Sequence, residues 1–237
     1  MTDLPHIFVQ GADGAIGERG KSGQYGANPG KSGTNGKQSW WSGCTCATSG
    51  DPGENAVSSG SKGGRGGDGA PAPSFTLTAQ TFQGSLHIAS LGGGGGDGGQ
   101  GGAGGSGTAG GDGGTNKADC VSSGKCQPTS GGRGGAAGDG GEGGDAGNGG
   151  NGGTITIYYT ATPPRDIMPT SQGGAAGAPG LSGEPGLAGK GGKNETLNGQ
   201  NPTYAPDGTA GVGLGGGKAG NPGSNGEIVI TPLPQAV

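Results

Sequence analysis

Apolar and aromatic residues are scarce in this chain of 237 residues. Hydrophobic residues make up 26% of it, with only three Phe, four Tyr and two Trp. A globular core of ordinary size is excluded, because so little apolar surface cannot offset the conformational entropy that folding costs. Runs of about 18 apolar residues are also missing, which excludes a membrane-spanning helix. The first 20 residues lack the basic start and apolar stretch of a signal peptide.

Groups that support catalysis or bind nucleotides are equally rare. The two histidines, His6 and His87, fall in predicted strands, and the net charge of -4 provides no basic face for nucleic acid. Gly-Lys-Ser occurs at 20–22 and 30–32, but the glycine that opens a phosphate-binding loop is replaced by Ala15 and Tyr25. Asp97 lacks the aliphatic residue of a calcium-binding nonapeptide. We therefore expect no enzyme activity, no catalytic residue, no cofactor and no metal.

Glycine supplies 69 of the residues and recurs at every third position. The runs with this period cover 11–36, 50–69, 92–113, 132–153, 174–192 and 208–226. A left-handed polyproline-II-type helix has three residues per turn, so this period places glycine along one edge of each helix. Such a helix has no internal hydrogen bonds, and its backbone groups need neighbouring chains as partners. The sequence predicts a non-α bundle of about six antiparallel polyproline-II-type helices.

Two features of the runs separate this bundle from collagen. Proline accounts for 16 residues, about 7% of the chain, whereas collagen needs about 15–20% proline and hydroxyproline. The runs 92–113 and 132–153 read Gly-Gly-X, so each has two edges without side chains. We expect these two runs in the centre of the bundle, and the Gly-X-X runs 11–36 and 174–192 at its periphery.

The apolar residues and the polar loops alternate along the chain in a way that predicts two different ends. Short stretches with strand-like alternation are expected at one end, the base: His6–Gln10, Ser74–Gln80, Ser85–Ser90, Thr154–Tyr159 and Glu227–Thr231. We expect the stretches Ser74–Gln80 and Ser85–Ser90 to form a strand pair, and residues 160–172 to form a loop at the base. Loops at 37–47, 115–130 and 193–207 gather at the other end, the tip. Residues 1–237 are expected to form a single domain capped by an apolar cluster at the base.

All four cysteines lie in the predicted tip loops. Cys44 and Cys46 belong to the first loop, and Cys120 and Cys126 belong to the second. Disulfides would strengthen a protein with so small a core, and four cysteines allow three pairings. Cross-pairing of the two loops is geometrically natural if they are neighbours. A zinc site and free thiols are the alternatives, although the spacing is not that of a zinc finger.

The tip loops also contain the candidate ligand-binding residues. These are Trp40, Trp41, Lys117, Asn194 and Tyr204. Paired tryptophans at the end of a loop are typical of contacts with sugars or proteins, but packing over the end of the bundle is an open alternative. Asn194 also begins an Asn-Glu-Thr glycosylation sequon.

The glycine runs with intervening loops resemble the polyglycine-II bundle proteins. Two families show the pattern: the tail-fibre tip adhesins of T-even-like phages and, more distantly, the snow flea antifreeze proteins. The resemblance covers about 11–153 and 173–226. The adhesins imply receptor binding by the tip loops. The antifreeze proteins imply a flat, uncharged face, whereas here Glu18, Arg19 and Lys21 interrupt the first run.

These observations predict a non-enzymatic recognition or attachment protein. Its tip loops would bind a cell-surface glycan or protein receptor. The protein itself would be extracellular or located on a virion surface. One alternative is a structural subunit that assembles through its strands, with copies of itself or with another virion or filament subunit. The second alternative is an ice-binding protein.

Overall fold

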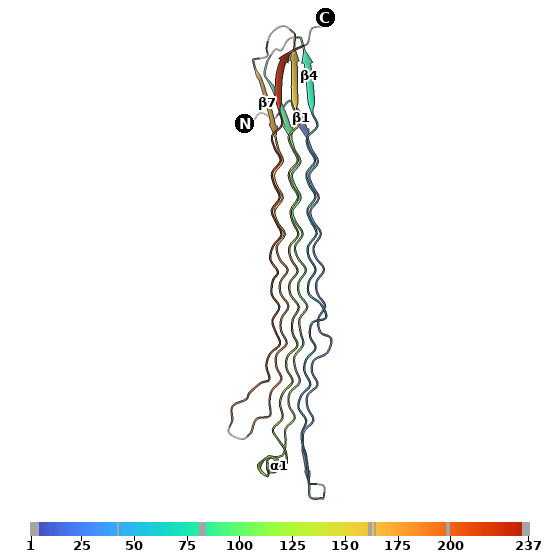
Figure 1. Ribbon diagram of the computed structural model, residues 1–237, viewed down its shortest axis with the longest axis vertical. Helices are drawn as coiled ribbons and strands as arrows, with labels where there is room; N and C mark the ends of the chain where they lie inside the picture. Colours follow the sequence, from blue (N-terminus) through green and yellow to red (C-terminus); the bar gives the residue numbers. More distant parts are fainter. Residues whose placement is uncertain are drawn as a thin grey trace.

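The computed structural model describes residues 5–41, 43–80, 84–160, 163, 165–197 and 200–233. The protein is a long rod with strands at one end, the base, and loops at the other end, the tip (Figure 1). The base strands form two three-stranded sheets. Both Pro5 and Leu233, the first and last described residues, adjoin base strands. The two ends of the described chain are therefore separated from the tip by the length of the rod.

The base consists of two parallel sheets packed on each other. One has the order β1 (Ile7–Gln10), β5 (Leu86–Leu91), β7 (Ile167–Gln172), and the other β4 (Phe75–Ala79), β6 (Ile155–Tyr159), β8 (Ile228–Pro232). Alternation of apolar and polar residues gives each strand one inward face. The inward side chains form the apolar cluster expected at the base: Ile7, Phe75, Leu77, Leu86, Ile88, Ile155, Ile157 and Ile167.

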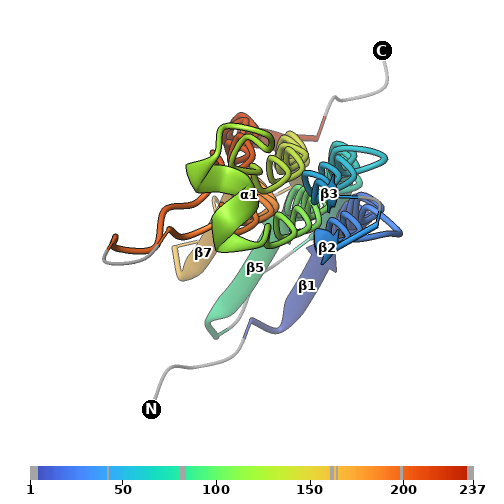
Figure 2. The same cartoon turned by 90° about the horizontal axis from the view of Figure 1, so that it is seen from below.

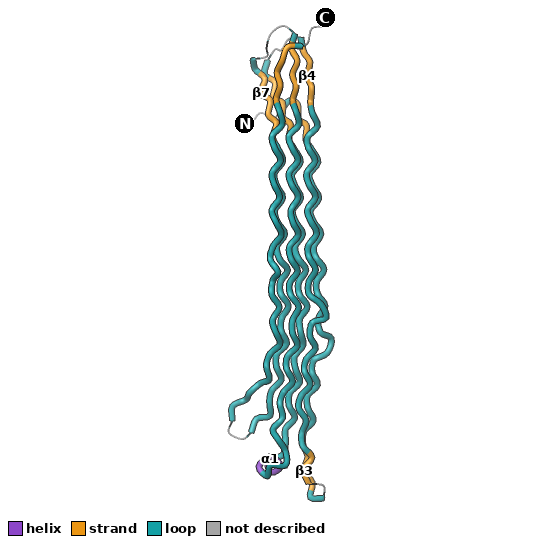
Figure 3. Tube along the Cα trace, in the orientation of Figure 1, coloured by secondary structure: helices purple, strands orange, loops and turns teal. Residues whose placement is uncertain are grey.

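Six extended glycine-rich segments form the shaft of the rod between base and tip, at about 11–36, 48–73, 92–114, 131–153, 173–192 and 208–226 (Figure 3). Seen along the axis, they form two rows of three (Figure 2). Backbone hydrogen bonds join them at every third residue: Gly14 N–H donates to Gly94 O, and Gly95 N–H to Ala175 O, both over 2.8 Å. These bonds take the place of a larger apolar core.

The expected fold class, a bundle of antiparallel polyproline-II-type helices, is wrong. Regular secondary structure in the described residues is mainly strand, in two parallel sheets, with one short helix, α1 (Ala118–Ser122). Glycine at every third position determines how closely two segments approach, but it leaves their relative direction open. The direction follows from the longer repeat of the chain, which the sequence analysis missed.

That longer repeat is a unit of strand, glycine segment, loop, glycine segment and strand, present three times. Ile7 pairs with Ile88 and Leu86 with Ile167, an offset of 81 residues in each case. In the second sheet Phe75 pairs with Ile155, 80 residues away. Equivalent strands of successive units thus lie side by side in the same direction, which makes both sheets parallel.

Three further expectations need correction. The segment 160–172, expected as a loop, contains β7, because the third unit also begins with a strand. The strands β4 and β5 lie in different sheets and do not form a pair. The tip loops contain regular structure, namely α1 and a hairpin of β2 (Lys37–Ser39) and β3 (Gly43–Thr45).

The central position of the two Gly-Gly-X segments is confirmed. A Cβ atom at Gly101 would lie 2.1 Å from the carbonyl oxygen of Gly141, and one at Gly102 would lie 1.9 Å from that of Lys21. Both distances are far below van der Waals contact, so neither position accepts a side chain. Segment 92–114 therefore has close backbone neighbours on two sides, which is why two residues of each triplet are glycine.

The third unit ends the array. Gly98 and Gly104 donate their N–H groups to segment 173–192. The 81-residue offset makes Pro179 and Pro185 their equivalents in that segment. Proline has no N–H to donate, and prolines are typical of sheet edges that do not pair further. The two prolines therefore remove two of the N–H donors that would continue the pattern of hydrogen bonds along this edge.

Candidate functional site at the tip

The first tip loop is a hairpin that carries two tryptophans at its end. Lys37 pairs with Thr45 and Ser39 with Gly43. Gly43 has a φ of 72°, which glycine adopts without strain at such a turn. Trp40 and Trp41 are 82% and 80% exposed, and their rings stack with centroids 3.9 Å apart and an interplanar angle of 20°. The tryptophans thus do not pack over the end of the rod.

Two disulfides fix the hairpin to the second loop. Cys44 is bonded to Cys120, and Cys46 to Cys126. Both partners in the second loop are buried, at 1% and 2% exposure. Two of the three open pairings join the two loops, and one of these two is the pairing formed. The described residues include no free cysteine. Covalent bonds hold strand β3 at its middle residue, Cys44, and at Cys46, directly after its last residue.

The second loop holds α1, and Lys117 immediately precedes this helix as its N-cap residue. The Lys117 side chain makes no capping hydrogen bond and is exposed. The first turn contains the buried Cys120, so α1 serves to position a disulfide. The ligand-binding role of Lys117 stays a prediction from the sequence.

The third loop uses one predicted binding residue for its own structure. Asn194 Oδ1 accepts a hydrogen bond from Gly131 N–H over 2.9 Å, and Asn194 Nδ2 donates to Thr203 Oγ1 over 3.0 Å. Tyr204 forms a bridge with Lys193 and is 63% exposed. Asn194 therefore holds the two sides of the loop together, whereas Tyr204 presents its ring to solvent.

Asn116 connects all three tip loops and was missed by the sequence analysis. Its Oδ1 accepts from Ala47 N–H over 2.8 Å, and its Nδ2 donates to Gln127 O over 3.1 Å and to Glu195 Oε2 over 2.7 Å. Asn116 is 7% exposed. Glu195 Oε2 also accepts from Thr129 N–H over 2.9 Å. A polar residue two positions after the last glycine of a run is the signal that the sequence offers, and many loop residues share it.

The loops do not converge on one pocket. Figure 2 shows the hairpin and the third loop at opposite sides of the rod, with α1 between them. Trp40 and Trp41 form one exposed site together, and Tyr204 lies on another loop. The pKa of Asp207, near the third loop, is lowered by hydrogen bonds from the Lys190 ammonium and Gly191 N–H. The same ion pair raises the pKa of Lys190.

The described residues show neither a metal cluster nor a membrane-spanning helix. Within the described ranges, His, Cys, Asp and Glu side chains form no group of three or more that could hold a metal ion. The described part of the chain also has no helix long and apolar enough to cross a membrane. The two disulfides are consistent with an extracellular protein, because they persist in oxidising surroundings.

Comparison with known proteins identified no family. No family model matches the chain, and no curated protein matches it. Among solved structures, it is similar to a springtail antifreeze protein from Granisotoma rainieri, described as a bundle of nine polyproline type II helices whose crystal waters match the ice lattice. The identity is 26% over 91% of this chain and 97% of that one, with a TM-score of 0.17. Such a weak likeness decides neither fold nor function, and the resemblance to phage adhesins is unsupported.

Proposed function

We propose that this protein is a non-enzymatic recognition protein that binds a glycan or protein receptor through the hairpin at its tip. The observation that carries the proposal is the pair Trp40 and Trp41, both exposed on a hairpin that two disulfides anchor. Exposing two large aromatic rings is costly in water, and aromatic residues are enriched at binding sites. A ligand that covers the outer ring faces would recover this cost.

The rest of the fold suits presentation rather than chemistry. Hydrogen bonds at every third residue make the shaft continuous from base to tip. The hairpin is tied to α1 by the disulfides, and Asn116 joins its end to the other loops. A ligand-binding site that is held in one geometry before binding loses less entropy when the ligand arrives.

A binding screen with matched variants tests the proposal. The wild-type protein is applied to a glycan array and to candidate receptor proteins, and the affinity of each hit is measured by isothermal titration calorimetry, which does not depend on the two tryptophans of the chain. Trp40→Ala/Trp41→Ala is expected to abolish binding, while Leu187→Ala, which removes another exposed apolar side chain from the shaft, leaves it unchanged. Retention of full affinity by the double variant would refute the proposal.

The alternatives have less support. Continuation of the array from one copy to the next is disfavoured as a route to a structural assembly, because Pro179 and Pro185 leave two gaps in the row of N–H donors at its last edge. Ice binding would need a flat uncharged face. The exposed row of segment 131–153 instead carries Asp139, Glu142 and Asp145, of which Asp139 and Asp145 accept backbone hydrogen bonds from Val212 and Lys218.

A further inference from the structure

Three side chains that can ligate a metal lie in a row across the base, at the opposite end from the tip. His87 on β5 is paired in register with Met168 on β7. On the other side of β5, His6 directly precedes β1, and its N–H donates to His87 O over 3.0 Å. Neighbouring strands are about 4.8 Å apart, so His6, His87 and Met168 are successive cross-strand neighbours.

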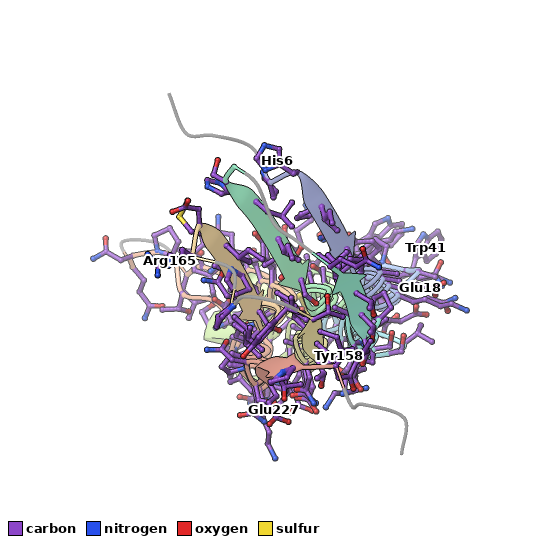
Figure 4. The ribbon with its side chains drawn as sticks, turned by 90° about the horizontal axis from the view of Figure 1, so that it is seen from above. His6, Glu18, Trp41, Tyr158, Arg165 and Glu227 are labelled. Carbon is purple, nitrogen blue, oxygen red and sulfur yellow. A yellow bond between two sulfur atoms is a disulfide. The ribbon has the colours of Figure 1, made fainter. Side chains whose placement is uncertain are left out.

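All three side chains are on the outer face of the sheet. Ile88 points into the core with 1% exposure, so the adjacent His87 points outward. Met168 is 53% exposed, and together with His87 it lines a shallow hollow. Figure 4 shows His6 at the outer side of the strand layer, away from the second sheet. The centroids of the His6 and His87 rings are 5.5 Å apart.

We propose that His6, His87 and Met168 bind a soft monovalent cation of the Cu(I) type through two imidazole nitrogens and one thioether sulfur. An imidazole nitrogen lies about 2 Å from a bound metal, which puts two ring centroids that share an ion at most about 6 Å apart. The observed separation falls within that limit. This site is independent of the recognition hairpin and uses none of its residues.

The chemistry of the row selects the class of metal. Thioether sulfur favours Cu(I), and imidazole accepts copper as well as zinc. The hollow is lined by Pro5, His87, Ile88, Ala89, Met168 and Thr170, without a carboxylate for a harder cation such as Mg²⁺ or Ca²⁺. Thiols do not compete for the ion, because Cys44, Cys46, Cys120 and Cys126 are all in disulfides.

Binding requires one local change. His6 Nδ1 accepts a hydrogen bond from His87 N–H over 3.1 Å, which leaves the proton of the neutral ring on Nε2. Rotation of the exposed His6 ring would break this bond, which contributes about 1 kcal/mol, and turn a nitrogen toward the ion. The backbone hydrogen bond from His6 N–H to His87 O keeps the residue in place meanwhile.

Titration of the full chain with Cu(I), delivered as its acetonitrile complex against a competing chelator without reductant, tests the site. One equivalent is expected to bind. His87→Gln and Met168→Leu are each expected to lower the affinity about tenfold or more, because even outer-shell partners of metal ligands have effects of that size. His6→Gln should lower the affinity for Cu(I) to a similar extent. An excess of Zn²⁺ should not displace Cu(I) from the wild-type protein.

X-ray absorption of the loaded protein gives an independent readout, with one sulfur and two nitrogen neighbours expected around copper. Unchanged affinity in Met168→Leu, or a spectrum without a sulfur neighbour, would overturn the proposal. Leu keeps the size of the exposed Met168, and circular dichroism of the metal-free variants shows whether each one folds. If His87→Gln unfolds, Met168→Leu and the absorption spectrum still decide the outcome.

Discussion

Asn116 and Glu195, 79 residues apart in the sequence, are joined by a hydrogen bond of 2.7 Å between Nδ2 and Oε2. A second hydrogen bond connects Asn116 N–H with Glu195 Oε1. Because Asn116 also accepts from Ala47 N–H, one buried amide side chain links the three tip loops. The tip loops are therefore joined by this side chain as well as by the two disulfides.

The first prediction concerns this link. Glu195→Ala removes the acceptor of Asn116 N–H and of Thr129 N–H, and leaves these two part-buried donors without that partner. Asn116 Nδ2 loses one of its two acceptors. We expect a loss of about 1–3 kcal/mol in the free energy of unfolding, measured with urea. Faster hydrogen exchange at Thr129 N–H should accompany it. Glu184→Ala, at an exposed position of the shaft, is the matched control and should change neither value.

The second prediction concerns the disulfides, which close chain separations of 76 and 80 residues. Replacing Cys46 and Cys126 by Ser should cost little, since Cys44–Cys120 still restricts nearly the same length of unfolded chain. Replacing all four should cost about 2–4 kcal/mol. Thermal unfolding of both variants measures the difference. If the variant without Cys46 and Cys126 lost half as much unfolding free energy as the variant without all four cysteines, the two disulfides would act independently and the prediction would be wrong.

The third prediction compares two glycines of the same segment. A Cβ at Gly102 would lie 1.9 Å from a backbone carbonyl oxygen, whereas one at Gly94 would come no nearer than 3.5 Å to Asp13 Oδ1. Gly102→Ala should destabilise the protein by about 3 kcal/mol through overpacking. Gly94→Ala should be neutral or stabilise it by about 0.4–1 kcal/mol, because alanine restricts the unfolded chain. Urea unfolding of the two variants distinguishes them.

The fourth prediction concerns pH. Hydrogen bonds from the Asn28 side chain, Asn28 N–H and Ala27 N–H lower the pKa of Glu54 from its usual 4.5. A carboxyl whose pKa is lower in the folded state stabilises the protein fully above its unfolded pKa, and this stability is lost as the pH falls through the folded value. The stability difference between wild type and Glu54→Gln should therefore shrink below pH 4.5. A difference that stays constant down to the acid limit would contradict this assignment.

The sequence by itself determined where the chain makes close backbone contacts and where it turns. Glycine period and the Gly-Gly-X pattern placed 92–113 and 132–153 in the centre, because only positions next to a backbone must lack Cβ. Apolar alternation marked the strands of the base, since it reports which face is buried. The position of the four cysteines in two tip loops indicated disulfides but left three pairings open.

Only the tertiary structure decided the direction and the partners. The parallel sheets arise because three units of about 80 residues lie side by side, and the period of three contains no information about that longer repeat. The role of Asn116 was equally hidden, because its partners Ala47 and Glu195 are 69 and 79 residues away. The row of His6, His87 and Met168 likewise depends on strand register. Contacts between distant residues are set by how whole units stack, and a local pattern does not record that.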